Sequence, residues 1–127
     1  MRRIVLLALT VVLVALPLRA EAVHRPTNYC SPSGDICQST TKVNGIRWLR
    51  IGLFAKYFDR YGLCVKAPDG SKACRTFEIR AHGSTFGSNV RWGVHFPHKG
   101  PGPYSVSWST GGNKVGRILG FHRRVPA

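Results

Sequence analysis

Glu78, Arg80 and His82 are the side chains whose types and spacing could carry out a reaction. If the strand expected over residues 75–80 runs on to His82, all three project from one face, because every second residue of a strand does so. A carboxylate, a guanidinium and an imidazole are the groups that a secreted ribonuclease needs. Glu78 would be the general base, His82 the general acid, and Arg80 would stabilise charge developing on the phosphate.

The same residues also have a purely structural interpretation. Glu78 could form a surface ion pair with Arg80 or with a neighbour across the sheet, and His82 could simply end the strand. The surrounding sequence has none of the motifs that flank the catalytic residues of microbial ribonucleases. We therefore favour the structural interpretation and predict that the protein is not an enzyme, with a basic secreted ribonuclease as the alternative.

Other catalytic and metal-binding arrangements have less support. His95 and His98 flank Phe96-Pro97, and His24 lies near the predicted mature N-terminus, but neither paired carboxylates nor close cysteines accompany them. Metal sites need such ligands at suitable spacing. No Gly-x-Ser-x-Gly elbow marks a serine nucleophile. The chain also has few acidic residues, which argues against hydrolysis by paired carboxylates. We predict no metal site and no cofactor.

Positive charge is the strongest feature of the composition. The 127 residues include 19 lysines and arginines but only 5 aspartates and glutamates, a formal net charge of +14. Such a charge attracts nucleic acid, lipid headgroups or phosphate-rich cell-wall polymers. The candidate anion-binding residues, at predicted surface or strand-end positions, are Arg47, Arg50, Lys66, Arg80, Arg91, Lys114, Arg123 and Arg124. Alternatively the charge only keeps the domain soluble, because no basic run with interleaved aromatics marks a nucleic-acid groove.

Four cysteines can pair in three ways, and their spacing ranks the pairings. Cys64 and Cys74 flank the turn signal Pro68-Asp69-Gly70, and a hairpin centred on Asp69 places the two cysteines opposite each other. Opposed residues of antiparallel strands are close enough for a disulfide. Cys30 and Cys37 then close the loop 31–35. The gaps of six and nine residues are too long for a zinc knuckle, so we predict two local disulfides.

Short alternating runs of apolar and polar residues predict an all-β domain of about seven strands. Alternation is clearest over 75–80, 104–109 and 90–96, where Val90, Trp92, Val94 and Phe96 occupy every second position. Further strands are expected over 36–43, 46–54 and near 114–122.

Three places in this pattern are ambiguous. Apolar residues within 46–61 also fit helical spacing, but we favour a strand through about Ala55 followed by a bend. Arg75 and Arg117 fall on inward-facing positions. They could lie at sheet ends, or a β-bulge could reset the alternation.

Residues 1–22 have the layout of a secretory signal peptide. Arg2 and Arg3 precede an apolar run that ends at Leu18, and Ala22 completes a small-residue cleavage site. The run is shorter than the about 20 residues of a membrane anchor, so we predict cleavage after Ala22 and no transmembrane segment afterwards. The remaining 105 residues contain 16 basic and 4 acidic residues, a net charge of +12. We expect 23–35 to form an N-terminal loop segment and 36–127 the β-domain.

The segment 96–108 places Pro101-Gly102-Pro103 directly before an alternating run that begins at Tyr104 and ends at Trp108. It is similar to the proline-glycine-x-tyrosine-x-valine-x-tryptophan corner near the end of secreted bacterial immunoglobulin-like sandwiches. With the two cysteine loops, most of 29–122 resembles a group of small secreted bacterial proteins with this fold. The resemblance implies a structural hydrogen bond from the Tyr104 hydroxyl to the preceding turn, and it implies no activity.

We therefore expect a secreted or cell-envelope protein with an immunoglobulin-like β-sandwich of about seven strands and two local disulfides. From the sequence we expect it to act as a binding or interaction module that engages anionic polymers or surfaces through charge. A ribonuclease using Glu78, Arg80 and His82 is one alternative. A structural envelope component without a discrete ligand is the other, and the sequence identifies no protein partner.

Overall fold

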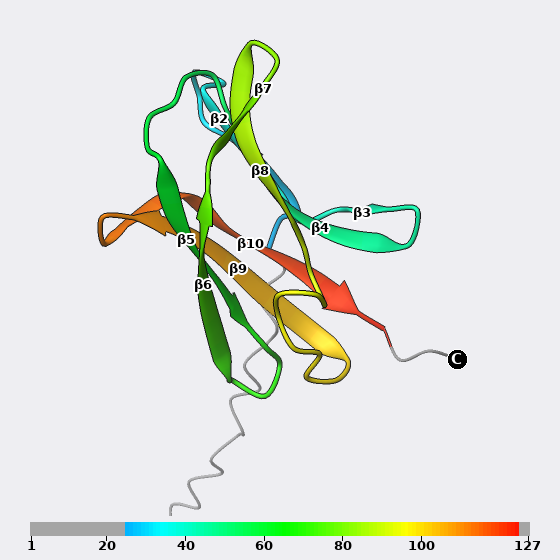
Figure 1. The fold of residues 1–127 in the computed structure, drawn as a ribbon. Helices are drawn as coiled ribbons and strands as arrows, with labels where there is room; N and C mark the ends of the chain where they lie inside the picture. Colours follow the sequence, from blue (N-terminus) through cyan, green and yellow to red (C-terminus); the bar gives the residue numbers. More distant parts are fainter. Residues whose placement is uncertain (1–24, 125–127) are drawn as a thin grey trace, which may run out of the picture.

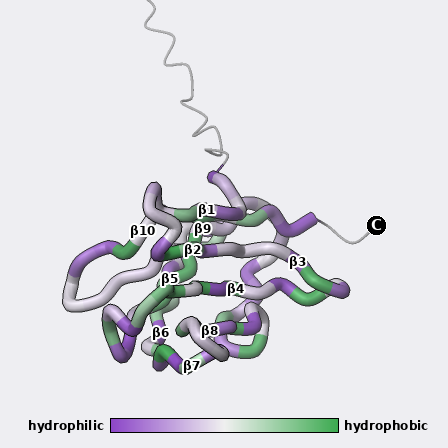
Figure 2. Tube along the Cα trace, turned by 90° about the horizontal axis from the view of Figure 1, so that it is seen from above, coloured by the Kyte–Doolittle hydropathy of each residue, from purple (hydrophilic) through white to green (hydrophobic). Residues whose placement is uncertain are grey.

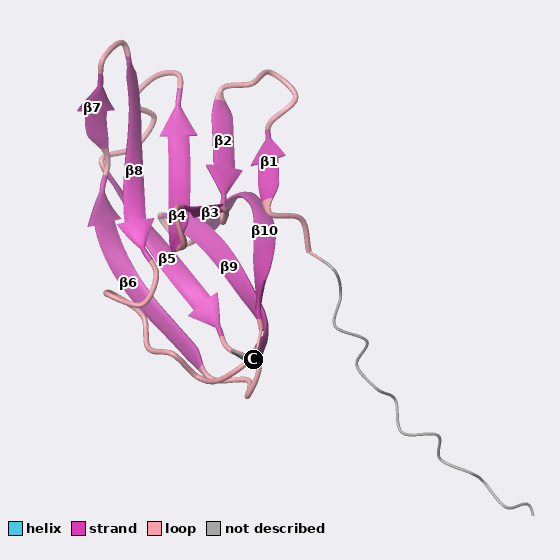
Figure 3. Cartoon of the chain, turned by 90° about the vertical axis from the view of Figure 1, so that its right-hand side faces the viewer, coloured by secondary structure: helices cyan, strands magenta, loops and turns pink. Residues whose placement is uncertain are grey.

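A computed structural model describes residues 25–124, so the predicted signal peptide over 1–22 lies outside the described residues. Within 25–124 the protein is all-β, and its antiparallel strands form two sheets that face each other (Figure 1 and Figure 3). The six-stranded sheet has the order β1 (Asn28–Cys30), β2 (Ile36–Ser39), β4 (Ile46–Leu53), β8 (Thr85–Arg91) and β7 (Arg80–His82), with β3 (Lys42–Val43) paired to β4. The four-stranded sheet has the order β10 (Asn113–Arg123), β9 (Gly102–Thr110), β5 (Arg60–Lys66) and β6 (Lys72–Glu78).

Side chains from the inner faces of both sheets form one hydrophobic core. Buried and more exposed residues alternate along β4, β5 and β9, so each strand has one buried and one outer row. Along β4, hydrophilic residues interrupt the hydrophobic ones (Figure 2). The buried rows of β4, β5 and β9 consist of Leu49, Ile51, Leu53, Tyr61, Leu63, Val65, Tyr104, Val106 and Trp108. The strand predicted over 46–54 is confirmed, and a bend follows it as expected.

Both predicted disulfides are confirmed, and each joins opposed residues of neighbouring strands. Cys30 pairs with Cys37 between β1 and β2, and Cys64 pairs with Cys74 between β5 and β6. The Cα–Cα distance is 4.1 Å in both. The turn around Asp69 fixes the β5–β6 register, because its carboxylate accepts hydrogen bonds from the backbone N–H and the hydroxyl of Ser71.

Two buried polar residues, Gln38 in β2 and Thr40 directly after it, hold the edge strand β10 of the other sheet. The Gln38 amide donates to the Val115 carbonyl at 3.0 Å and accepts from the Arg117 N–H at 3.1 Å. The Thr40 hydroxyl donates to the Gly120 carbonyl at 2.8 Å. We call Gln38, Thr40 and these β10 backbone groups the polar clamp. Every hydrogen bond in it links the two sheets.

The polar clamp surrounds a β-bulge in β10. The partners shift from Val115 opposite Trp108 to Leu119 opposite Val106, which leaves extra residues in β10. This bulge resets the alternation and leaves Arg117 exposed, one of the two outcomes predicted for that residue. Arg75 is exposed as well, because it lies on the edge strand β6.

Three sequence predictions about strands are wrong. The strand expected over 90–96 ends at Arg91, because the chain turns at Gly93, whose φ of +92° suits glycine. Val94 consequently points outward and is 65% exposed. The expected loop over 23–35 contains the short strand β1. The strand expected over 36–43 is interrupted after Ser39. Such short strands raise the count within 25–124 from about seven to ten.

The loop after β8 covers one end of the core. It buries Trp92 and Phe96. The Tyr104 hydroxyl donates to the Gly100 carbonyl at 2.6 Å and accepts from the Lys99 N–H at 3.1 Å. These bonds hold the turn before β9 in the way that the resemblance implies for the tyrosine corner.

Candidate functional site

Three of the eight predicted anion-binding residues lie on the outer face of the six-stranded sheet. Arg50 stands opposite Ser39 on β2 and Asn89 on β8. Arg80 on β7 stands opposite Gly87, and Arg91 stands opposite Trp48 on β4. We call this outer surface, with Asn28 and His82 at its margins, the arginine face. Strand pairing alone thus gathers arginines that are far apart in the sequence.

The arginine face is hollowed where two glycines stand opposite each other. Gly52 and Gly87 are cross-strand partners, so this row of the sheet lacks side chains above its two central strands. The hollow has a volume of about 650 Å³, and its lining includes Arg50, Asn89 and His82. The Cys30–Cys37 disulfide borders it on the β1–β2 side. The hollow therefore offers hydrogen-bond donors around an open floor.

Arg50 is the most distinctive side chain of the hollow. Its guanidinium carbon lies over the Trp48 ring, 5.4 Å from the ring centre, within the range of a cation–π interaction. Its Nε is buried and has no hydrogen-bond partner among the described residues. A buried donor without a partner costs free energy, typically about 1–3 kcal/mol. Arg50 is thus placed at the hollow, where its terminal guanidinium nitrogens, which have no hydrogen-bond partner among the described residues, can donate to an anion.

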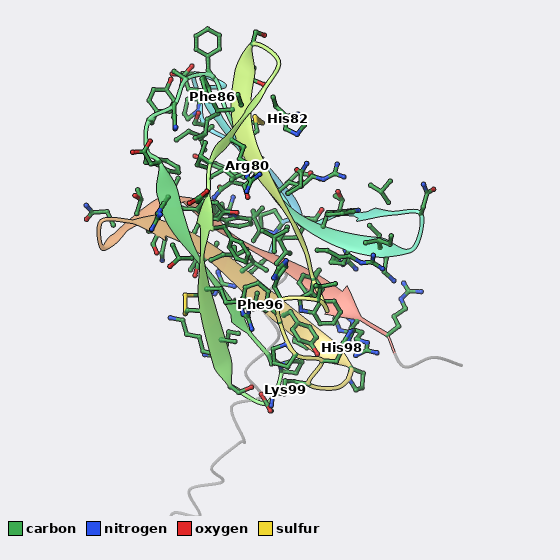
Figure 4. The ribbon with its side chains drawn as sticks, in the orientation of Figure 1. Arg80, His82, Phe86, Phe96, His98 and Lys99 are labelled. Atoms are coloured by element: carbon green, nitrogen blue, oxygen red, sulfur yellow. A yellow bond between two sulfur atoms is a disulfide. The ribbon has the colours of Figure 1, made fainter. Side chains whose placement is uncertain are left out.

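Glu78, Arg80 and His82 do not share one strand, so the predicted arrangement on a single face is wrong. Glu78 ends β6 in one sheet. Arg80 and His82, both labelled in Figure 4, belong to β7 in the other sheet. Ile79 between them is buried, and its N–H donates to the Asp59 carbonyl. The chain therefore crosses between the sheets at Ile79, which breaks the alternation.

The structure gives Glu78 a partner on the neighbouring strand. Its carboxylate lies 3.2 Å from the guanidinium of Arg60, which stands opposite it on β5. This is the cross-strand ion pair of the structural interpretation. All the same, Glu78, Arg80, His82 and His95 line a common hollow of about 700 Å³ beside β7. The three ribonuclease candidates are thus neighbours in space, although they lie on different strands.

The other predicted basic residues separate into two groups. Arg47, Arg123 and Arg124 lie near one end of the sandwich, and two of them pack on aromatic rings. Arg47 lies over Phe121, and burial lowers its pKa. Arg123 lies over the ring of Trp92. These contacts give Arg47 and Arg123 structural roles.

Lys66 and Lys114 lie on the outer face of the four-stranded sheet, away from the arginine face. Lys66 stands opposite Lys72 on β6 and Ser105 on β9. Lys114 stands opposite Ser109. The sequence prediction missed Lys72, although the hairpin centred on Asp69 already placed it opposite Lys66. It also missed Arg25, for which the sequence contains no signal.

Ion pairs neutralise little of this charge. Only two join residues within 25–124, Lys56 with Asp59 and Arg60 with Glu78. The described part of the chain also contains no cluster of three histidine, cysteine, aspartate or glutamate side chains suited to a metal ion. No helix within it is long and apolar enough to cross a membrane.

Comparisons of the chain with protein-family models, with curated proteins and with solved structures find no match. The candidate site is consequently interpreted from its own residues. Its chemistry is that of arginine, amide and hydroxyl donors around an open hollow, with one buried donor unsatisfied. Such a site can bind an anion.

Proposed function

We propose that the protein is an extracytoplasmic binding module, with an immunoglobulin-like β-sandwich, that engages an anionic polymer across its arginine face. The tyrosine corner at Tyr104 and the two-sheet architecture support the immunoglobulin-like class. Two disulfides are consistent with an extracytoplasmic location, and the signal peptide predicted from the sequence over 1–22 would direct the chain there. The single observation that carries the binding proposal is Arg50, which packs on Trp48 at the hollow and whose guanidinium has no hydrogen-bond or ion-pair partner among the described residues.

A polymer fits this face better than an isolated ion. Arg50, Arg80 and Arg91 come from three different strands. Neighbouring strands lie about 4.8 Å apart, so a chain of repeated negative charges can contact several of them at once. The hollow is open to solvent along the sheet, and a cell-wall polymer, a nucleic acid or a layer of lipid headgroups supplies such repeated charges.

The test uses a labelled single-stranded RNA as a probe, with binding and RNA length measured together over a salt series. The triple variant Arg50→Gln, Arg80→Gln and Arg91→Gln should bind at least about tenfold more weakly, with a salt slope reduced by about 2. The matched control changes Lys42, Lys56 and Lys99 to glutamine and removes the same charge outside the arginine face. Equal loss in both variants would refute a face-specific site.

A second variant tests the hollow without changing charge. The space above Gly52 is open, since an added Cβ would come no closer than 4.0 Å to the Cys37 carbonyl oxygen. Gly52→Val should therefore fold normally and weaken RNA binding by filling the floor. Unchanged binding by a folded Gly52→Val protein would show that the hollow is not used.

The ribonuclease alternative is retained because Glu78, Arg80 and His82 line one hollow. In the same assay it requires the RNA to shorten with time, and Glu78→Gln should abolish the cleavage. RNA that stays intact at low salt speaks against it. A protein that neither binds nor cleaves RNA at low salt would favour the other alternative, a structural envelope component whose charge serves solubility.

A further inference from the structure

The outer face of the four-stranded sheet is a second basic surface with a different construction. Its central strand β9 presents Ser105, Ser107 and Ser109 outward, between the buried residues Tyr104, Val106 and Trp108. Gly62 stands opposite Ser109, and the Cys64–Cys74 disulfide stands beside Ser107. We call this surface the serine face. Its floor contains only small side chains.

Three cations converge at one end of the serine face. One row across all four strands reads Gly120, Ser105, Lys66 and Lys72 from β10 to β6. The hollow above this row has a volume of about 390 Å³, and its lining includes Arg25, Lys66, Lys72, Ser105 and Ser107. No acidic residue lines it. Among the described residues, neither the two serine hydroxyls nor the three cations form a side-chain hydrogen bond or an ion pair.

Arg25 is held at this hollow by the backbone. The Gly120 N–H donates to the Pro26 carbonyl at 3.0 Å, which fixes the chain next to Arg25 against β10. A Cβ on Gly120 would lie 2.9 Å from the Cβ of Arg25, so only glycine allows this close approach. The third cation is thus positioned by a pairing that depends on one glycine.

Ammonium, guanidinium and hydroxyl donors around a small hollow are complementary to a tetrahedral oxyanion, which accepts several hydrogen bonds at once. The exposed large hydrophobic residues Val43, Phe54, Tyr57 and Val94 lie elsewhere. Ile118 is the one large apolar residue that lines the hollow of the serine face, and it is half-buried, so this face offers little apolar surface for entering a lipid layer. These two properties favour phosphate groups on a soluble chain.

We propose that the serine face is a second binding site, for the phosphate groups of a polymer, on the opposite side of the sandwich from the arginine face. The inner faces of the two sheets pack against each other around the core, so their outer faces point in opposite directions (Figure 3). One molecule then holds two polymer chains and joins them. The joining, although not the serine-face site itself, rests on the function proposed for the arginine face.

The experiment measures capture of a second strand. The protein is bound to beads that carry a single-stranded RNA, unbound protein is removed, and a labelled RNA of the same sequence is added. The serine-face variant changes Arg25, Lys66 and Lys72 to glutamine, and the arginine-face variant and the lysine control are those described above. Wild type and the lysine control should capture labelled RNA. Each single-face variant should stay on the beads but capture at most about a tenth as much.

The outcomes separate the two proposals. Capture by the serine-face variant at the wild-type level overturns the serine-face site. If the arginine-face variant binds RNA as tightly as wild type while the serine-face variant no longer binds, the function proposed for the arginine face fails and the serine-face site stands alone. Vesicles of phosphatidylglycerol serve as the lipid arm. A serine-face variant that loses only vesicle binding would also overturn the assignment to a soluble polymer.

Discussion

The polar clamp and the arginine face both use polar side chains of the six-stranded sheet, but these side chains differ in whether they form hydrogen bonds. Gln38 is 3% exposed, and both ends of its amide are hydrogen-bonded to β10. On the outer side of the same sheet, Arg50 has a buried Nε without a partner. Buried polar groups are normally hydrogen-bonded, so the satisfied group and the unsatisfied group call for different explanations.

The difference separates groups that hold the fold from partnerless groups on the surface, such as the terminal guanidinium nitrogens of Arg50, that are available to a ligand. Every hydrogen bond of the polar clamp joins one sheet to the other, so its free energy contributes to folding. The donors of the arginine and serine faces have no such partners, so their hydrogen bonds remain available for binding. We therefore expect clamp variants to change stability but not affinity, and variants of the two faces to change affinity more than stability.

Removal of the clamp amide tests this separation most strongly. Gln38→Ala leaves the buried Val115 carbonyl and the partly buried Arg117 N–H without partners and should reduce the free energy of unfolding by about 4 kcal/mol. Denaturant unfolding measures the loss. Ser39→Ala changes the next residue, on the outer side, and should cost less than about 0.5 kcal/mol. A loss below about 1 kcal/mol for Gln38→Ala would contradict the role of the clamp.

The paired glycines of the arginine face should respond differently to alanine. A Cβ on Gly87 would lie 2.6 Å from the Ile51 carbonyl oxygen, so Gly87→Ala forces β4 and β8 apart and should cost about 3 kcal/mol. Gly52→Ala meets open space and should leave stability unchanged or raise it by about 0.5 kcal/mol. Similar losses in both variants, measured by denaturant unfolding, would contradict this contrast between crowded space at Gly87 and open space at Gly52.

The sequence was sufficient to predict features fixed by local chemistry. The Pro68-Asp69-Gly70 turn set the hairpin register and with it the Cys64–Cys74 disulfide. Arg117 falls on an inward-facing position of the alternation, and this already suggested a β-bulge as one of two explanations from the sequence alone. In each case, the residues that determine the feature are within about ten positions of each other.

Features that depend on the distant course of the chain could not be predicted in this way. Alternation continues past Arg91 through Trp92, Val94 and Phe96, although the chain turns at Gly93, because a turn can bury the same residues as a strand. Likewise, alternation continues through Ile79, where the chain changes sheets. The arginine face requires β8 to pair with β4, a contact over about forty residues that leaves no local signal.

Tyr61 offers a test of a satisfied polar group inside the core. Its hydroxyl donates to the Ser88 hydroxyl at 2.8 Å, and burial raises its pKa to about 12. The unfolded chain ionises Tyr61 near pH 10, so its stabilising contribution is complete below that pH and is lost as the pH rises toward 12. Wild type should lose about 2 kcal/mol more stability between pH 9 and pH 12 than Tyr61→Phe does. Parallel pH profiles of unfolding would show that Tyr61 does not titrate abnormally.

The smallest expected effect concerns His98, a polar group with a partner at the exposed end of the sandwich. Arg123 approaches the His98 Nδ1 at 2.5 Å, and partial burial together with the positive charge of Arg123 lowers the pKa of His98 from its ordinary value of 6.5. The unfolded chain therefore binds the proton first as the pH falls. The contribution of His98 is present above about pH 6.5 and is lost as the pH falls through the lower pKa of the folded state.

NMR titration of the His98 ring should give a pKa below 6.5, and Arg123→Gln should raise it toward that value. Arg117→Gln removes an equal charge from the bulge, and a comparable rise in this control would mean that net charge rather than contact lowers the pKa. A His98 pKa at or above 6.5 in the unmodified protein would contradict the contact itself. Because His98 is exposed, its titration should change global stability far less than the loss of the clamp amide does.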